Sequence, residues 1–165
     1  MKKTMLIFDI LTVSAFGVLL HFLFDWSGEN NFVGLFSAVN ESIWEHQKLL
    51  FWPTAVLSII EYYALKKPIG FLLSRFVATI LGMLFIIVVY YTFTGVVGKN
   101  IDAFNIALFF IAVIFTFLIS RIFEKNHFFT SANSNKIALI GFLFVALMFF
   151  VFTKNPPKIG LFKEP

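Results

Sequence analysis

The sequence predicts an all-α protein, an integral membrane bundle of five transmembrane helices. Two features of the composition indicate this class. Of the 165 residues, 59% are hydrophobic and only 13% are charged, whereas about a quarter of the residues in an ordinary soluble domain are charged. A third observation is that apolar runs of roughly 18 or more residues recur along the chain, and a helix of that length crosses a hydrocarbon core of about 30 Å.

The apolar runs define a single membrane domain over residues 1–165, without a separate soluble domain. Charged, glycine-bearing or proline-bearing stretches separate the runs. The expected spans are residues 4–24, 46–65, 70–95, 103–120 and 137–152. Residues 36–53 are expected to straddle the outer membrane boundary, and residues 153–165, which contain Pro156 and Pro157, form an extended tail.

The basic residues predict the orientation of these spans. Five spans place 8 of the 13 Lys and Arg on the side of the N-terminus, and an excess of positive charge marks the inner side of a membrane. The N-terminus is therefore expected inside and the C-terminus outside, in a bacterial cytoplasmic membrane. No basic block interleaved with aromatic residues lies outside the spans, so the expected partner is the lipid bilayer, and nucleic acid is not expected. The absence of cysteine excludes disulfides and thiol nucleophiles.

The most polar stretch of the chain, residues 40–48, begins the second span. It reads Asn-Glu-Ser-Ile-Trp-Glu-His-Gln-Lys, and such a cluster of ionisable groups is costly near a bilayer. Asn40 is expected to cap the helix and Glu41 to lie in its first turn, where the helix dipole favours a carboxylate. Pro53 is expected to kink this helix or mark a restart.

A second polar pair lies at the outer end of the first span. His21 and Asp25 are four residues apart and therefore share a helix face. Because the first two spans run antiparallel, this pair is expected to reach the same depth as Glu41, Glu45 and His46. Two imidazoles and three carboxylates would then converge.

Imidazole and carboxylate without thiolate are ligand types that suit zinc, manganese or ferrous iron, and the same groups can act as general acid and base. The predicted catalytic residues are His21, Asp25, Glu45 and His46; the predicted ligand-binding residues are Asn40, Glu41, Trp44 and Lys48; and the metal-ligand candidates are His21, Asp25, Glu41, Glu45 and His46. The alternative is a metal-free hydrogen-bonded cluster that fixes the helix ends, with Glu45 paired to Lys48.

A layer of charged residues is expected near the inner face. Asp9, Glu61 and Arg75 each lie about five residues from the inner end of a span, which places them at one depth of about 8 Å. A buried charge-paired triad is the simplest account, because an unpaired carboxylate there would cost several kcal/mol or stay protonated. A proton relay is the alternative. The first two spans offer few hydroxyl groups between the two polar layers, so little is expected to line a continuous pathway.

Several blocks of the sequence resemble a family of small bacterial membrane proteins, number 6512 among the domain-of-unknown-function families. These blocks are residues 20–28, 36–51, 60–63, 90–95, 98–102 and 156–162. The resemblance extends over nearly the whole chain, and its most specific part is the Asn-Glu-Ser-x-Trp-Glu-His motif of residues 40–46. The resemblance implies no activity.

Three functions follow as hypotheses. The first is binding of a small polar or lipid-headgroup ligand at the outer face, with metal-assisted chemistry as one form of it, so whether the protein is an enzyme stays open. The second is a small proton-coupled transporter that uses Asp9 and Glu61. Its weakness is the apolar middle of the bundle, because carriers bind near the midplane. The third is a structural or accessory membrane subunit without a catalytic role.

Overall fold

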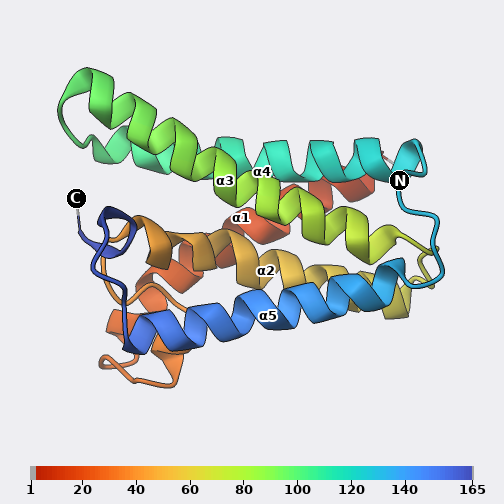
Figure 1. Ribbon diagram of the computed structural model, residues 1–165, viewed down its shortest axis with the longest axis horizontal. Helices are drawn as coiled ribbons and strands as arrows, with labels where there is room; N and C mark the ends of the chain where they lie inside the picture. The colour runs from red at the N-terminus through yellow and green to blue at the C-terminus, as the bar shows by residue number, and fades with distance from the viewer. Residues whose placement is uncertain (1–2, 165) are drawn as a thin grey trace.

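The computed structural model describes residues 3–164 and contains five long helices packed as an elongated bundle (Figure 1). The helices are α1 (Lys3–Trp26), α2 (Ile43–Ala64), α3 (Phe71–Val97), α4 (Asp102–Lys125) and α5 (Ser134–Lys154), with short 3-10 helices η1 (Val33–Leu35) and η2 (Gly160–Phe162). No strand occurs in the described residues, so the predicted all-α class is confirmed. Helix α4 extends beyond residue 120, where the fourth span was expected to end.

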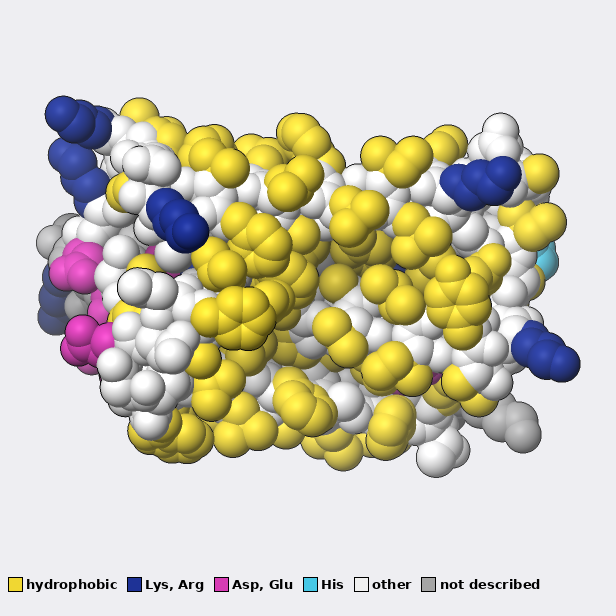
Figure 2. Space-filling view, turned by 90° about the horizontal axis from the view of Figure 1, so that it is seen from below, with side chains coloured by type: hydrophobic (Ala, Val, Ile, Leu, Met, Phe, Trp, Pro, Cys, Tyr) yellow, Lys and Arg dark blue, Asp and Glu magenta, His cyan; other side chains and the backbone are white. Residues whose placement is uncertain are grey.

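Four of the helices are long and apolar enough to cross a membrane: α1 from Thr4 onward, α3, α4 and α5. Their outward faces carry large hydrophobic side chains, among them Leu11, Val88 and Ile140, each more than 60% exposed. Figure 2 shows hydrophobic side chains across the middle of the bundle and Lys and Arg at both ends. A continuous apolar surface of this extent is unfavourable in water. The fold is therefore consistent with a multi-pass membrane protein.

Helix α2 places more polar residues inside the bundle than any of the other four helices does. It packs against α1, α3 and α5, and these neighbours bury its ionisable and polar side chains. The buried set is Glu45, Gln47, Lys48, Thr54, Ser58 and Glu61. The other helices thus shield the charges of α2 from the surroundings of the bundle.

The helix continues through Pro53, and the expected restart is wrong. Proline has no N–H to donate to the carbonyl four residues earlier, which is that of Leu49. Gly17 of α1 packs against this carbonyl, and a Cβ at Gly17 would lie 2.7 Å from the Leu49 oxygen. The helix therefore continues through Pro53 without this backbone hydrogen bond, and Gly17 lets α1 approach α2 closely at that point.

Helix α2 begins later than expected. Ser42 is the N-cap: it has extended backbone angles, and its Oγ accepts a hydrogen bond from the Glu45 N–H at 3.3 Å. Asn40, which was predicted to be the cap, instead accepts from the Ser42 N–H at 3.0 Å. Glu41 therefore precedes the helix, and the expectation that it lies in the first turn is wrong. Both residue types cap well, but the Glu three residues after Ser42 favours Ser42.

The C-terminal tail folds back onto α2. Most of it is non-helical, as expected, except for the single turn of η2. The ring of Phe162 lies 4.9 Å from that of Trp44 and 5.4 Å from that of Phe152. This aromatic contact fastens the tail over the N-terminal end of α2, beside the polar motif.

Candidate metal site and buried ion pairs

Three of the predicted site residues meet at the end of the bundle that is expected to face outward. His21 comes from the last turns of α1, Glu41 from the loop before α2, and His46 from the first turn of α2. The His46 Nε2 lies 3.4 Å from Glu41 Oε2, and the His21 Nε2 lies 3.9 Å from Glu41 Oε1. One ligand atom from each residue falls within 4.8 Å of the other two. We call this group the outer triad.

The backbone orients one of the two imidazoles. The Nδ1 of His46 lies 3.0 Å from the Ser42 carbonyl oxygen. When Nδ1 donates to that oxygen, Nε2 is left as the nitrogen with a free lone pair, which is the arrangement seen around most metal-binding histidines. The two imidazole rings lie 5.2 Å apart. The side chains are 34% (His21), 65% (Glu41) and 27% (His46) exposed, so a solute can reach the triad.

The spacing of the triad resembles that of metal ligands. Nitrogen and oxygen atoms bound to one ion at about 2.1 Å lie roughly 3 to 3.5 Å from one another. The Glu41–His46 distance of 3.4 Å already falls in this range, and His21 is slightly farther away. Of the other predicted metal ligands, Asp25 is exposed on α1 and lies outside the triad.

Glu45, also predicted as a ligand and as a catalytic residue, belongs to a different, buried group. The Lys48 Nζ donates to Glu45 Oε2 at 2.5 Å, to the Gly34 carbonyl at 2.8 Å and to the Ser37 carbonyl at 3.1 Å. Glu45 also accepts from the Val39 N–H at 3.1 Å and from the Thr153 hydroxyl at 3.1 Å. The pair joins α2 to the η1 loop and to the end of α5. All three N–H donors of Lys48 are therefore occupied, and none is left for an anionic ligand. The pairing of Glu45 with Lys48 is the one expected under the alternative, in which the polar cluster fixes the helix ends.

Trp44 and Asn40 also make contacts within the protein, Trp44 by packing and Asn40 by a hydrogen bond to the backbone. The indole of Trp44 is 8% exposed and packs on Phe149, Phe152 and Phe162. Asn40 caps the turn before α2 through its bond to the Ser42 N–H. Of the four predicted ligand-binding residues, Glu41 alone belongs to the outer triad.

A cavity of about 520 Å³ opens at the same end of the bundle. Its size falls within the range of sites for small molecules. It is mostly apolar and has a lysine at its edge; the lining residues are Phe24, Asn31, Gly34, Leu35, Val39, Thr153 and Lys154. Phe24 lies one helical turn after His21, and Val39 lies two residues before Glu41. The cavity is therefore lined by residues close in sequence to the outer triad. Sequence reasoning missed this cavity because it forms only when η1 packs against α5.

The inner charged residues converge as predicted, and the structure adds a fourth member. The Nη2 of Arg75 lies 2.6 Å from Asp9 Oδ2 and 2.8 Å from Glu61 Oε2. Glu124 of α4 also takes part, with its Oε1 3.7 Å from Arg75 Nε. The guanidinium packs between the rings of Phe71 and Phe117. We call these four charged residues the inner cluster.

Glu124 was missed because it follows the last apolar residues of the fourth span and resembles a polar helix end. A signal was present in its spacing from Ser120, one turn earlier, whose hydroxyl donates to Glu124 Oε1 at 3.0 Å. Residues four apart share a helix face, so Glu124 lies on the same face of α4 as the buried Ser120.

A helical bundle with an apolar belt, a buried charge cluster at one end and a histidine–glutamate triad at the other is consistent with a multi-pass α-helical membrane protein, because four helices are long and apolar enough to cross a membrane. The chain belongs to the family of unknown function DUF6512, whose model matches residues 1–165. The predicted resemblance to this family is thereby confirmed. Searches of curated proteins and of solved structures found no match.

Proposed function

We propose that this protein spans the membrane five times and binds a divalent transition-metal ion at its outer face through His21, Glu41 and His46. The observation that carries the proposal is the convergence of these side chains from two helices and a loop, with ligand atoms within 4.8 Å of one another. Two imidazoles and one carboxylate suit zinc, manganese or ferrous iron, and such ions bind other ligands at the remaining positions.

Binding of a small polar or lipid-headgroup ligand is the function that such an ion would support. Three protein ligands leave at least one coordination position for water or for an oxygen of the ligand, and the ion polarises what it binds. The cavity beside the triad supports this proposal, because its apolar lining and the nearby Lys154 suit an amphiphile with an anionic headgroup. The Glu45–Lys48 pair holds the η1 loop that forms one wall of this cavity.

Five spans follow from treating α2 as a membrane helix. Its 22 residues extend about 33 Å, which matches a hydrocarbon core of about 30 Å. Its charges are buried against α1, α3 and α5, so they do not face lipid. An odd number of spans puts the termini on opposite sides, and the basic residues favour the N-terminus inside, in a cytoplasmic membrane.

Metal binding is tested with the full-length protein purified in detergent through a tag without histidine. Titration with zinc and with manganese, followed by calorimetry and by elemental analysis after dialysis, should give one ion per chain for the wild type. His46→Ala and His21→Ala should each weaken binding by about tenfold or more, because each removes one of three ligands.

His127→Ala is the matched control. His127 is the third histidine of the chain and lies after α4, outside the triad, where it is exposed. The control should bind like the wild type. Equal metal content in the wild type, in both triad variants and in the control would refute the metal site. If the triad variants also melted at lower temperature, that result would assign the triad a helix-fixing role.

A further inference from the structure

We propose that the inner cluster binds at least one exchangeable proton, which it takes up from the inner end of the bundle through a pocket that Glu124 and His127 line. The inference is independent of the metal site, because the two polar groups lie at opposite ends of α2. It concerns Asp9, Glu61 and Glu124, which surround the single guanidinium of Arg75.

The charge count of the cluster is unbalanced. One guanidinium faces three carboxylates, and the exposed fraction of these side chains is 0% for Asp9 and Arg75, 5% for Glu61 and 17% for Glu124. With all groups ionised the cluster would carry two uncompensated negative charges in a low-dielectric interior. Charge left unpaired there costs several kcal/mol, and a protonated carboxyl group avoids this cost.

The other charged group that acts on the cluster is Lys67, in the turn after α2. Its ammonium contacts the Met5 sulfur at 3.3 Å and lies 5.0 Å from the centre of the Phe71 ring. Its charge acts on Glu61 from a distance, and it forms no ion pair with the three carboxylates among the described residues. At the start of α5, Ser134 and Asn135 are buried and uncharged, and the charged Lys136 is exposed. Lys67 therefore leaves the excess of carboxylates unpaired.

Two carboxylate oxygens support protonation. Asp9 Oδ1 and Glu61 Oε1 are buried and accept no hydrogen bond within the described residues. An ionised carboxylate oxygen without a donor loses its hydration with no compensation, which costs more than the same loss for a neutral carboxyl group. The geometry therefore favours the protonated form of at least one of these two groups.

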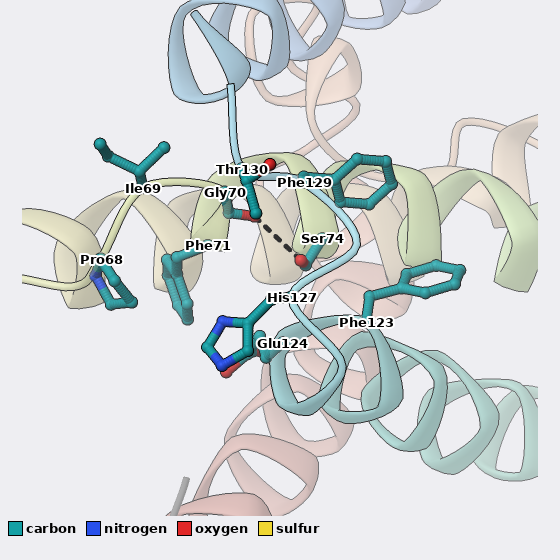
Figure 3. A pocket seen from close by; sticks show the side chains of 10 residues that line it. All are labelled: Pro68, Ile69, Gly70, Phe71, Ser74, Phe123, Glu124, His127, Phe129 and Thr130. Carbon is teal, nitrogen blue, oxygen red and sulfur yellow. Dashed lines mark hydrogen bonds between the residues drawn. The ribbon is translucent and has the colours of Figure 1, made fainter. Parts of the chain in front are cut away.

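A pocket lies beside the cluster, between the turn after α2 and the loop after α4, and Glu124 lines it (Figure 3). Its volume of about 60 Å³ holds several water molecules, because one needs roughly 15 Å³ by the same measure. Glu124 and His127 both line it, together with the turn from Pro68 to Phe71. Since Glu124 also reaches Arg75, this carboxylate belongs to both the pocket and the cluster.

The backbone keeps this pocket narrow. Gly70 has a φ of +86°, and a Cβ at this position would overlap the carbonyl of Phe129 from the loop before α5. The two loops therefore close over the pocket at a distance that only glycine permits. In the proposed step, a hydronium ion in the pocket gives a proton to a carboxylate oxygen of Glu124 and leaves water, and the proton then passes to Glu61 or Asp9. No bond other than O–H forms or breaks.

The proton is tested by infrared spectroscopy of the full-length protein in lipid nanodiscs. At neutral pH the wild type should show the C=O stretching band of a protonated carboxyl group, and the band should shift in D₂O. Glu61→Gln or Asp9→Asn should remove most of its intensity. Asp102→Asn, at an exposed carboxylate on α4, is the control and should keep the wild-type band.

The wild-type spectrum tests whether the cluster holds a proton even if a variant does not fold. A wild-type protein without the band at neutral pH would overturn the proposal. This holds also if the cluster binds a sodium ion in place of the proton. An unchanged band in folded Asp9→Asn, Glu61→Gln and Glu124→Gln variants would overturn it as well.

The route is tested with His127→Cys, which introduces the single thiol of the chain because the native sequence has no cysteine. A bulky maleimide on this thiol should slow the D₂O shift of the band at least severalfold. Ala132→Cys, exposed on the same loop but outside the pocket, is the labelled control. Equal exchange rates for the two labelled proteins would exclude this route.

Discussion

Lys48 is the residue whose surroundings most change how the outer motif is understood. As a sequence position it resembled an interfacial cation that could offset an anionic ligand. In the structure its side chain is fully buried, and its three donors are occupied by Glu45 and two backbone carbonyls. A buried pair of this kind is sensitive to loss of one partner, because the remaining charge then lacks compensation.

Lys48→Met should therefore destabilise the protein by about 3–5 kcal/mol. The variant leaves the Glu45 carboxylate without its charge partner and the carbonyls of Gly34 and Ser37 without the ammonium donor. The measurement is the free energy of unfolding in detergent, followed by denaturant titration. In the double variant with Glu45→Gln, the loss should be smaller than the sum of the two single losses, because the two residues interact directly.

Lys99→Met is the control for Lys48→Met. Lys99 is exposed in the turn between α3 and α4, so its removal should change stability by no more than about 0.5 kcal/mol. Equal effects of the two substitutions would show that the Lys48 pair contributes little to folding.

At the scale of the helices, the contact between α3 and α4 depends on a small residue. A Cβ at Gly82 of α3 would overlap the Thr116 hydroxyl of α4 and lie 3.1 Å from Leu50 of α2. Small residues allow membrane helices to approach closely where lipid supplies no hydrophobic driving force. Gly82 thus fixes the spacing of three helices, and Thr116 is fully buried at this point.

Gly82→Ala should lower the free energy of unfolding by about 1–3 kcal/mol through overpacking. Adding Thr116→Ala should recover part of the loss, since it removes the hydroxyl that the new methyl group meets. Thermal unfolding in detergent measures both effects.

Gly95→Ala provides the comparison within the same helix. A Cβ there has no neighbour within 4 Å, so only the higher helix propensity of alanine acts, and stability should stay unchanged or rise by up to about 1 kcal/mol. If Gly82→Ala behaved like Gly95→Ala, the helices would have room to move apart.

For the whole molecule, the distribution of polar groups defines two distinct ends. The outer triad and the open cavity lie at one end, and the inner cluster with its narrow pocket lies at the other. The hydrophobic belt between them (Figure 2) matches the position of a bilayer. The proposed metal and proton sites therefore face opposite compartments if all five helices span the membrane.

Single cysteines test this topology without background labelling. Under the five-span arrangement, Asn31→Cys and Lys99→Cys should react with an impermeant maleimide in intact cells. Lys66→Cys and Ala132→Cys should react only after permeabilisation. Labelling of Asn31→Cys and Lys66→Cys from the same side would contradict a membrane-spanning α2, and a complete reversal of the pattern would contradict the proposed orientation.

The sequence by itself determined the helical class and the inner Asp9–Glu61–Arg75 group. Hydrophobic runs long enough to span a bilayer leave few alternatives to helices, because every backbone group must be bonded within the segment. The same reasoning located the inner charges, because position along a straight helix translates directly into depth. The same reasoning predicted that His21 lies at the same depth as Glu41 and His46.

The tertiary structure decided which residues at the outer end share a site. Position along a helix specifies depth and relative faces, but not how the helix is rotated toward its neighbours. Glu41 also precedes the helix, so its predicted place in the first turn did not apply. Packing of the η1 loop drew Glu45 and Lys48 into the interior, while Glu41 remained exposed beside the two histidines. Packing of α4 likewise brought Glu124 to Arg75. These contacts join residues distant in sequence, and the direction each side chain faces depends on the neighbours that fold against it.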